Sequence, residues 1–218
     1  MTANPVLKKI IGIVVPLFIL WAAYYGTFSP LRKSQIFIDT LRGINSAHSL
    51  SDFEKAMSVP LDYRSPVGQE ELVRNTANMV LGIVQQNSDP KLIEEAVNYI
   101  ENYYKPIIDR GHGMSFEQNL YILGAINEMA ATKTSEVRYL EAAQKYYSKG
   151  LALGPKRPQF LFGLFDVYRM EGDVKNSIEI GQQIMNQWPT DTRTPAALDD
   201  FLARVRGATS SLQPPKQK

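Results

Sequence analysis

The stretch from Pro158 to Asp191, PQFLFGLFDVYRMEGDVKNSIEIGQQIMNQWPTD, decides the fold because it reads as two amphipathic helices joined by a turn. In each half, apolar residues recur at the spacing of one helix face. They are Phe160, Leu161, Leu164, Val167 and Tyr168 in the first half, and Val174, Ile178, Ile184, Met185 and Trp188 in the second. Gly172 and Asp173 predict the turn, and Pro189 predicts the end of the unit. The stretch therefore predicts a pair of antiparallel helices.

This helix pair resembles a tetratricopeptide repeat (TPR), whose unit has about 34 residues. The same spacing occurs one unit earlier, where Ala143, Tyr147, Gly150 and Pro155 match Ser177, Gly181, Ile184 and Pro189. The positions that define the repeat are Leu123, Gly124, Ala143, Tyr147, Pro155, Leu164, Tyr168, Gly172, Ser177 and Pro189. Two positions depart from the pattern, since Phe165 and Ile184 stand where smaller residues are usual. The resemblance implies an all-α fold, an α-solenoid of TPR-like helix pairs.

Helical periodicity continues on both sides of this pair. The apolar pattern predicts helices over residues 68–86, 91–109, 115–132 and 137–153, with Pro106 either kinking the second of these or ending it early. Residues 194–205 predict a capping helix that covers the last apolar face of the stack. We divide the chain into a membrane anchor (1–29), a degenerate helix pair with its connector (30–66), TPR-like repeats with the cap (67–206) and a disordered tail (207–218).

The N-terminal segment from Ile10 to Phe28 carries no charge over nineteen residues, which is enough for a helix to cross the hydrocarbon core. A cleaved signal peptide is disfavoured, because bulky aromatic residues surround Ala22 and Ala23. A buried soluble helix would show polar positions. The pattern favours a single-pass anchor, followed by a new helix that Ser29 caps and Pro30 begins.

Charges on both sides of the anchor bear on its orientation. Lys8, Lys9 and the terminal amine favour a cytoplasmic N-terminus and an extracytoplasmic soluble part, whereas Arg32 and Lys33 oppose that orientation nearly equally. A secreted form that has lost its first helix stays open as a third interpretation.

Composition narrows the functional classes. The chain has 218 residues, with 24 basic and 22 acidic side chains, and the excess of two equals the contribution of Lys8 and Lys9. A nucleic-acid binder would need clustered basic residues, so we expect no nucleic-acid partner. There is no cysteine, which excludes disulfides and thiolate chemistry. The two histidines, His48 and His112, both fall in predicted turns, and we expect no metal, no cofactor and no catalytic residue.

Tyrosines supply the only candidates for a binding surface. The simpler interpretation places their rings in the repeat core with the hydroxyls at its edge. The alternative is a groove lined by amphipathic aromatic rings and arginines that binds a peptide or a glycan. The candidate binding residues are Tyr103, Tyr104, Tyr139, Tyr146, Arg157 and Arg169.

The segment after the anchor suggests a second resemblance. SPLRKSQIFIDTLRGI (29–44), DFEKAMSVPLDYRSPVGQEELVRN (52–75) and the repeats that follow are similar to the C-terminal part of bacterial O-antigen ligase-like, or O-antigen polymerase-like, membrane proteins. In that family a last transmembrane helix precedes soluble TPRs. The family's catalytic residues lie in membrane helices and loops that this sequence lacks. The resemblance therefore implies an accessory or truncated region without transferase activity.

Two functional hypotheses follow. The first is a non-catalytic, membrane-anchored scaffold at the bacterial cell envelope, held by residues 10–28, that binds a protein or peptide in the solenoid groove. The second is an accessory part of a glycan-transfer system with glycan-assembly partners.

Overall fold

In a computed structural model of the full chain, the structure describes residues 5–211, and every regular element in that range is a helix. This confirms the all-α prediction. The helices are α1 (Pro5–Ala23), the π-helical turn η1 (Tyr24–Phe28), α2 (Ser29–Gly43), the 3-10 turn η2 (Ile44–Ser46), α3 (Leu50–Asp62), α4 (Gln69–Gln86), α5 (Pro90–Arg110), α6 (Phe116–Thr134), α7 (Val137–Leu153), α8 (Pro158–Glu171), α9 (Val174–Gln187) and α10 (Arg193–Ser211).

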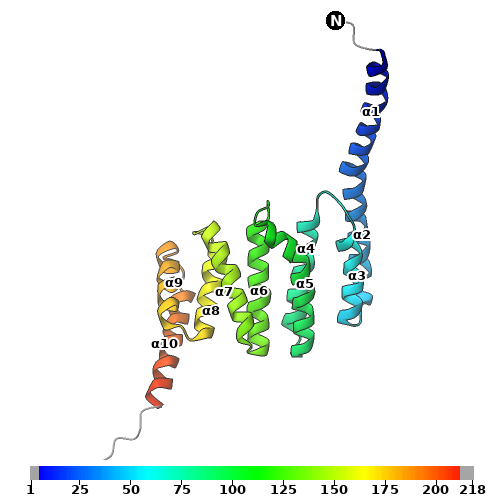
Figure 1. Cartoon of the computed structure of the whole chain (residues 1–218). Helices are drawn as coiled ribbons and strands as arrows, with labels where there is room; N and C mark the ends of the chain where they lie inside the picture. The colour runs from blue at the N-terminus through cyan, green and yellow to red at the C-terminus, as the bar shows by residue number, and fades with distance from the viewer. Residues whose placement is uncertain (1–4, 212–218) are drawn as a thin grey trace, which may run out of the picture.

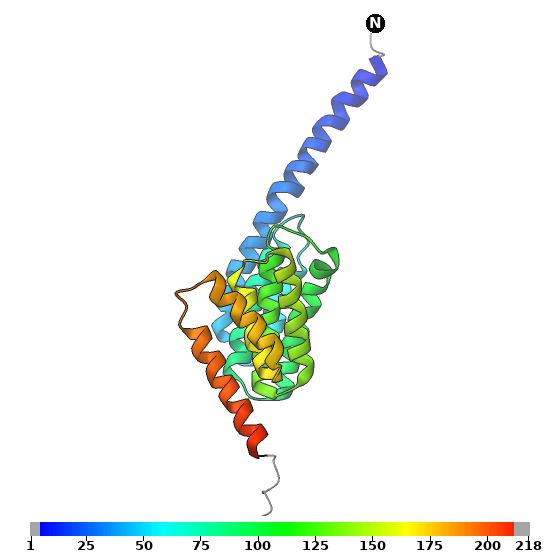
Figure 2. The same cartoon turned by 90° about the vertical axis from the view of Figure 1, so that its left-hand side faces the viewer.

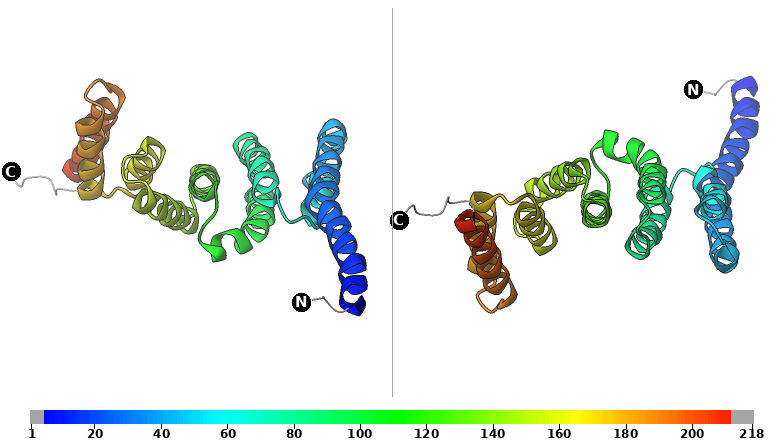
Figure 3. Two further views of the ribbon diagram at one scale, coloured as in Figure 1. Left: turned by 90° about the horizontal axis from the view of Figure 1, so that it is seen from above. Right: turned by 90° about the horizontal axis from the view of Figure 1, so that it is seen from below.

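The helices from α2 to α10 follow one another in a row, with the N-terminal pair at one end and α10 at the other (Figures 1 and 3). The main contacts join each helix to the next one or two along the chain, for example α6 to α7 and α8, and α4 to α5 and α6. Each apolar face is thus covered by neighbours close in sequence.

The pair α8–α9 has the turn that its sequence predicts. Gly172 ends α8 in the left-handed region at φ 75°, which a residue without a Cβ adopts readily. The amide of Asp173 then donates to the carbonyl of Tyr168 at 2.9 Å, as in a Schellman ending. The carboxylate of Asp173 accepts from the amide of Asn176 at 3.0 Å and so caps α9.

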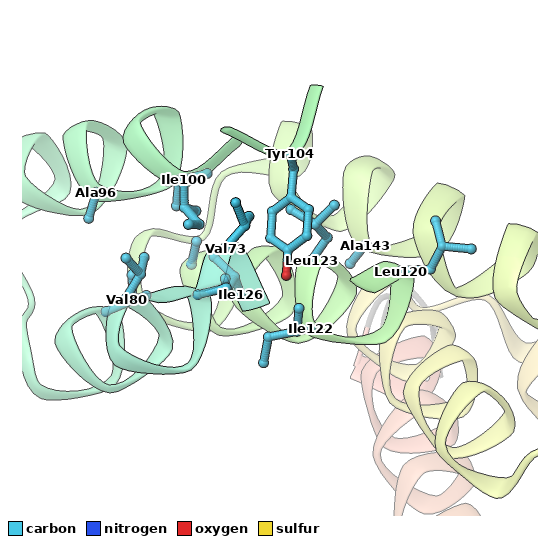
Figure 4. Packing of buried hydrophobic residues seen from close by; sticks show 14 of the residues in the cluster. Val73, Val80, Ala96, Ile100, Tyr104, Leu120, Ile122, Leu123, Ile126 and Ala143 are labelled. Carbon is cyan, nitrogen blue, oxygen red and sulfur yellow. The ribbon is translucent and has the colours of Figure 1, made fainter. Parts of the chain in front are cut away.

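The core consists of two clusters. The larger one runs from α2 to α8, and Figure 4 shows part of it, where side chains of α4, α5 and α6 meet. The smaller one joins α8, α9 and α10 through Leu161, Phe165, Ile184, Leu198 and Phe201. Pro106 does not end α5, which continues to Arg110.

Glycines set the spacing between helices around Tyr147. The ring of this residue lies between Gly124 of α6 and Gly163 of α8, and a Cβ at either glycine would overlap it. In the same way, a Cβ at Gly150 of α7 would overlap the ring of Phe160 of α8. Both rings are buried, so large side chains from one helix fill the space that missing side chains leave on its neighbours.

The N-terminal helix does not stop where the sequence predicts. The chain is helical without a break from Pro5 to Gly43, and Ser29 has helical backbone angles of −63° and −48°. The predicted Ser29 cap is therefore wrong. The π-helical turn Tyr24–Phe28 ends two residues before Pro30. Its wider spacing accommodates a proline, which has no amide hydrogen to donate and whose ring crowds the preceding turn.

The first part of this long helix stands away from the row (Figures 1 and 2), and the described side chains from Lys9 to Phe28 are all exposed. We call residues 5–28 the stem. Among the described residues, the helix from Lys9 to Gly43 is the one that is long and apolar enough to cross a membrane.

The foot of the stem is fastened to the row. The hydroxyl of Ser29 donates to the carbonyl of Arg64 at 2.9 Å. The buried ammonium group of Lys33 donates to the carbonyl of Tyr63 at 2.8 Å and also to the side chain of Gln69. These bonds tie α2 to the connector between α3 and α4 and to the start of α4.

At the other end, α10 begins one residue earlier than predicted and runs to Ser211. Residues 207–211, which we expected to be disordered, are therefore helical, and residues 212–218 lie outside the described range. A single glycine, Gly207, disfavours a helix by only about 1 kcal/mol, and the next proline is Pro214.

Candidate functional site

A groove lies between α6 and α8, and we call it the α6–α8 groove. It has a volume of about 390 Å³. Its lining residues are Leu81, Tyr121, Ala125, Glu128, Met129, Thr132, Tyr147, Gln159, Phe162, Gly163 and Asp166. Most come from α6 and α8, the first helices of two successive pairs, and Tyr147 is contributed by α7.

Glu128 and Asp166 are the charged groups of this lining. Burial raises the pKa of the Glu128 carboxyl to about 7, and the negative charge of Asp166 adds to that shift, while the hydrogen bond from Tyr147 and the charge of Arg169 oppose it. Burial also raises the pKa of Asp166, against the opposing effect of Arg169. The groove therefore holds two carboxyl groups whose ionised forms lack full solvation.

One hydrogen bond and one ion pair hold these carboxyl groups in place. The hydroxyl of Tyr147 donates to Oε2 of Glu128 at 2.7 Å. A guanidinium nitrogen of Arg169 lies 3.0 Å from Oδ1 of Asp166, and the same guanidinium group lies over the ring of Phe165. Of the two carboxylates, only Asp166 has a cation within ion-pair distance in the described range. An additional cation in the groove would be attracted to both.

Aromatic rings form the rest of the groove wall. Tyr121 is partly exposed, and its ring centroid lies 6.2 Å from that of Tyr147 and 6.4 Å from that of Phe160. Phe162 is half-buried and stacks on Trp188 at 6.0 Å. An aromatic face beside carboxylates is a combination that binds the guanidinium or ammonium group of a basic side chain.

Phe162 also lines two neighbouring hollows. One adjoins Trp188, Asp191 and Arg193, and the other adjoins Phe165, Arg169 and Arg193. The α6–α8 groove thus continues toward the N-terminal end of α10, with Phe162 as the shared wall.

The candidate tyrosines from the sequence lie mainly in the helix interfaces. Tyr104 and Tyr139 are buried, and the hydroxyl of Tyr104 lies 3.5 Å from Asn119. Tyr103 is half-buried, with its hydroxyl within 3.1 Å of Ser58 and 2.9 Å of Asp62. Tyr146 is half-buried, and burial raises its pKa to about 12.

The two candidate arginines lie apart from each other. Arg157 pairs with Glu117 beside the connector between α7 and α8. Arg169 lines the hollow next to the α6–α8 groove. The structure thus brings only Arg169 of the six candidate residues close to this groove.

Sequence reasoning missed Tyr121, Glu128, Phe162 and Asp166. A signal for them exists, since Tyr121, Ala125, Glu128 and Thr132 are spaced by four, three and four residues, and Phe162, Asp166 and Arg169 by four and three. These spacings mark one face of α6 and one face of α8. Whether such a face is covered or open depends on how the neighbouring helices pack, which the spacing within one helix does not show.

Among the described residues, no group of three or more histidine, cysteine or acidic side chains is arranged to hold a metal ion. In comparisons with known proteins, the chain matches no family model, no curated protein and no solved structure.

Proposed function

We propose that this chain is a membrane-anchored scaffold of TPR-like helix pairs whose α6–α8 groove binds a protein segment through a basic side chain. The observation that carries the proposal is the pair Glu128 and Asp166, partly buried in one groove beside the partly exposed rings of Tyr121 and Phe162. A bound guanidinium or ammonium group would compensate both carboxylates and stack on Tyr121 or Phe162.

The repeat assignment is supported by spacing and by contacts. A small residue and a proline, Ala143 and Pro155, have counterparts 34 residues later in Ser177 and Pro189, and the helices contact those next to them along the row. A solenoid of this kind leaves the faces of its first helices open to partners. No catalytic role is proposed for any residue.

The anchor is supported by the length, apolarity and exposure of the stem. We further propose that the helical row lies on the extracytoplasmic side of a cell-envelope membrane, in keeping with Lys8 and Lys9 before the apolar run. Alkaline extraction of membranes distinguishes an integral protein from a secreted one. Labelling of the single-cysteine variant Ser135→Cys with a membrane-impermeant maleimide in intact cells tests on which side of the membrane the helical row lies.

Selection of peptides tests the binding proposal. Full-length protein in nanodiscs is offered a phage-displayed library of random peptides, and the selected sequences are compared with those retained by the double variant Glu128→Gln, Asp166→Asn. We expect arginine or lysine to be enriched by the wild type and not by this variant. Glu179→Gln, an exposed change on α9, should keep the enrichment. Equal enrichment with the double variant would contradict the proposal.

A glycan-related role keeps one observation in its favour. The stacked rings of Phe162 and Trp188 line a hollow with Asp191 and Arg193, and such an aromatic platform beside polar groups suits a sugar ring. A glycan array probed with the nanodisc-embedded protein and with Trp188→Ala separates this alternative from peptide binding. Binding of glycans that is lost in Trp188→Ala would favour the role in glycan transfer.

A further inference from the structure

The stem leaves the row at the same end as four connectors. Because consecutive helices run antiparallel, every second connector returns to the end where α2 begins (Figures 1 and 2). These connectors comprise residues 63–68, 111–115, 154–157 and 188–192. We call this end of the row, together with the helix residues next to the connectors, the stem-side edge.

Contacts at the foot of the stem fix the position of this edge along the axis of the long helix. The first connector touches the long helix directly after the apolar run, since the Arg64 carbonyl accepts from Ser29, the residue that follows Phe28. The Tyr63 carbonyl accepts from Lys33 one turn later. If residues 10–28 cross a bilayer, the stem-side edge therefore begins at the level of its headgroups.

Exposed apolar side chains occur along this edge. Val67 is 59% exposed in the first connector, Met114 is 104% exposed in the second, and Leu153 is 50% exposed just before the third. These three side chains lie at three separate connectors, so they do not pack against one another as one cluster. Burial of exposed apolar area at this depth favours contact with the membrane interface.

Basic side chains accompany them. Arg64 and Lys156 are exposed on the same edge, and neither takes part in an ion pair within residues 5–211. Arg110 and Arg157 of this edge are already paired, with Glu70 and Glu117. Arg64 and Lys156 are therefore two cations that can meet lipid phosphates.

We propose that the stem-side edge is a second membrane contact, which lies on the bilayer that the stem crosses and inserts Val67, Met114 and Leu153 at headgroup depth. This rests on the proposed membrane anchor. The contact would hold the row against the lipid surface, with the connectors at residues 87–89 and 135–136 pointing away from it. Its partner is the lipid itself, through apolar tips and through phosphate groups.

The absence of cysteine from the chain makes a direct test simple. Single-cysteine variants Val67→Cys, Met114→Cys and Leu153→Cys of the full-length protein are labelled with an environment-sensitive fluorophore in phosphatidylcholine–phosphatidylglycerol vesicles. Nitroxide lipids placed in both leaflets then report depth. Val137→Cys is the matched control, because this valine is 63% exposed but lies at the opposite end of the row. Leu17→Cys reports on the stem.

We expect deep quenching at position 17, shallow quenching at 67, 114 and 153, and little at 137. Deep quenching at 17 together with equal signals at 114 and 137 would overturn the second contact while leaving the anchor in place. Loss of quenching at 17 would overturn both. In a background of Arg64→Glu and Lys156→Glu, quenching at 114 should fall by about two-fold or more when phosphatidylglycerol is present. If quenching at position 114 is unchanged in this background, Arg64 and Lys156 do not contribute to the membrane contact.

Discussion

The hydroxyl of Tyr147 donates to Glu128 at 2.7 Å across the interface between α7 and α6, and the ring that carries it lies between Gly124 and Gly163. One buried side chain thus connects the spacing of three helices to the charge of a groove residue.

Gly124→Ala should destabilise the protein. The added methyl group would overlap the Tyr147 ring, and overpacking of this kind costs about 1–3 kcal/mol in the free energy of unfolding. Denaturant unfolding measures the change. The control is Gly82→Ala in α4, where a Cβ meets no atom within 4 Å and alanine favours the helix by up to about 1 kcal/mol. A Gly124→Ala variant as stable as the wild type would mean that the Tyr147 ring does not lie against Gly124.

Tyr147→Phe should raise the pKa of Glu128 above its value of about 7. In the wild type the hydrogen bond from Tyr147 stabilises the ionised carboxylate, and the variant loses that stabilisation. Titration of the side-chain carboxyl carbons by NMR would show the shift. Tyr146→Phe, one residue away and without a bond to Glu128, is the control. An unchanged Glu128 titration in Tyr147→Phe would argue against the contact.

Stability should fall with rising pH because of Glu128. Its folded pKa of about 7 lies above the ordinary 4.5, so the folded state binds the proton more tightly. The resulting stabilisation is complete below about pH 4.5 and is lost as the pH rises through about 7, up to about 3 kcal/mol in all. Thermal or urea unfolding across this range should therefore show a smaller decline in Glu128→Gln than in the wild type, with Glu179→Gln as the control.

Phe201→Ala should loosen the C-terminal end of the row and little else. This buried ring joins α10 to the small cluster around Phe165 and Ile184, and its removal costs about 3–5 kcal/mol locally. Hydrogen exchange should accelerate in α9 and α10 while α4 and α5 keep their protection. Uniform acceleration along the whole chain would contradict a stack held together by neighbour contacts.

Local sequence patterns predicted the helices well where each helix carries its own signals. The bounds of α7 match the predicted 137–153, and the turn at Gly172 and Asp173 follows from residues that are adjacent in the chain. Such features depend on periodicity, caps and the conformational freedom of glycine, all of which act over a few residues.

Features that depend on distant partners were not predicted. Ser29 looked like a cap because its structural partner, the Arg64 carbonyl, lies 35 residues away. The groove residues Glu128 and Asp166 were not singled out from the sequence, since only the packing of α6 against α7 and α8 makes them partly buried. Tyr147 was identified as a repeat position, but its bond to Glu128 spans two helices.

The unbroken helix from Pro5 to Gly43 has a mechanical consequence. At about 1.5 Å per residue it is a rod of roughly 60 Å that continues into the folded row without a hinge. If residues 10–28 cross a bilayer as proposed, any tilt of this segment would rotate the α6–α8 groove through the same angle. The direction in which the groove faces a proposed partner would then depend on the orientation of this helix in the bilayer.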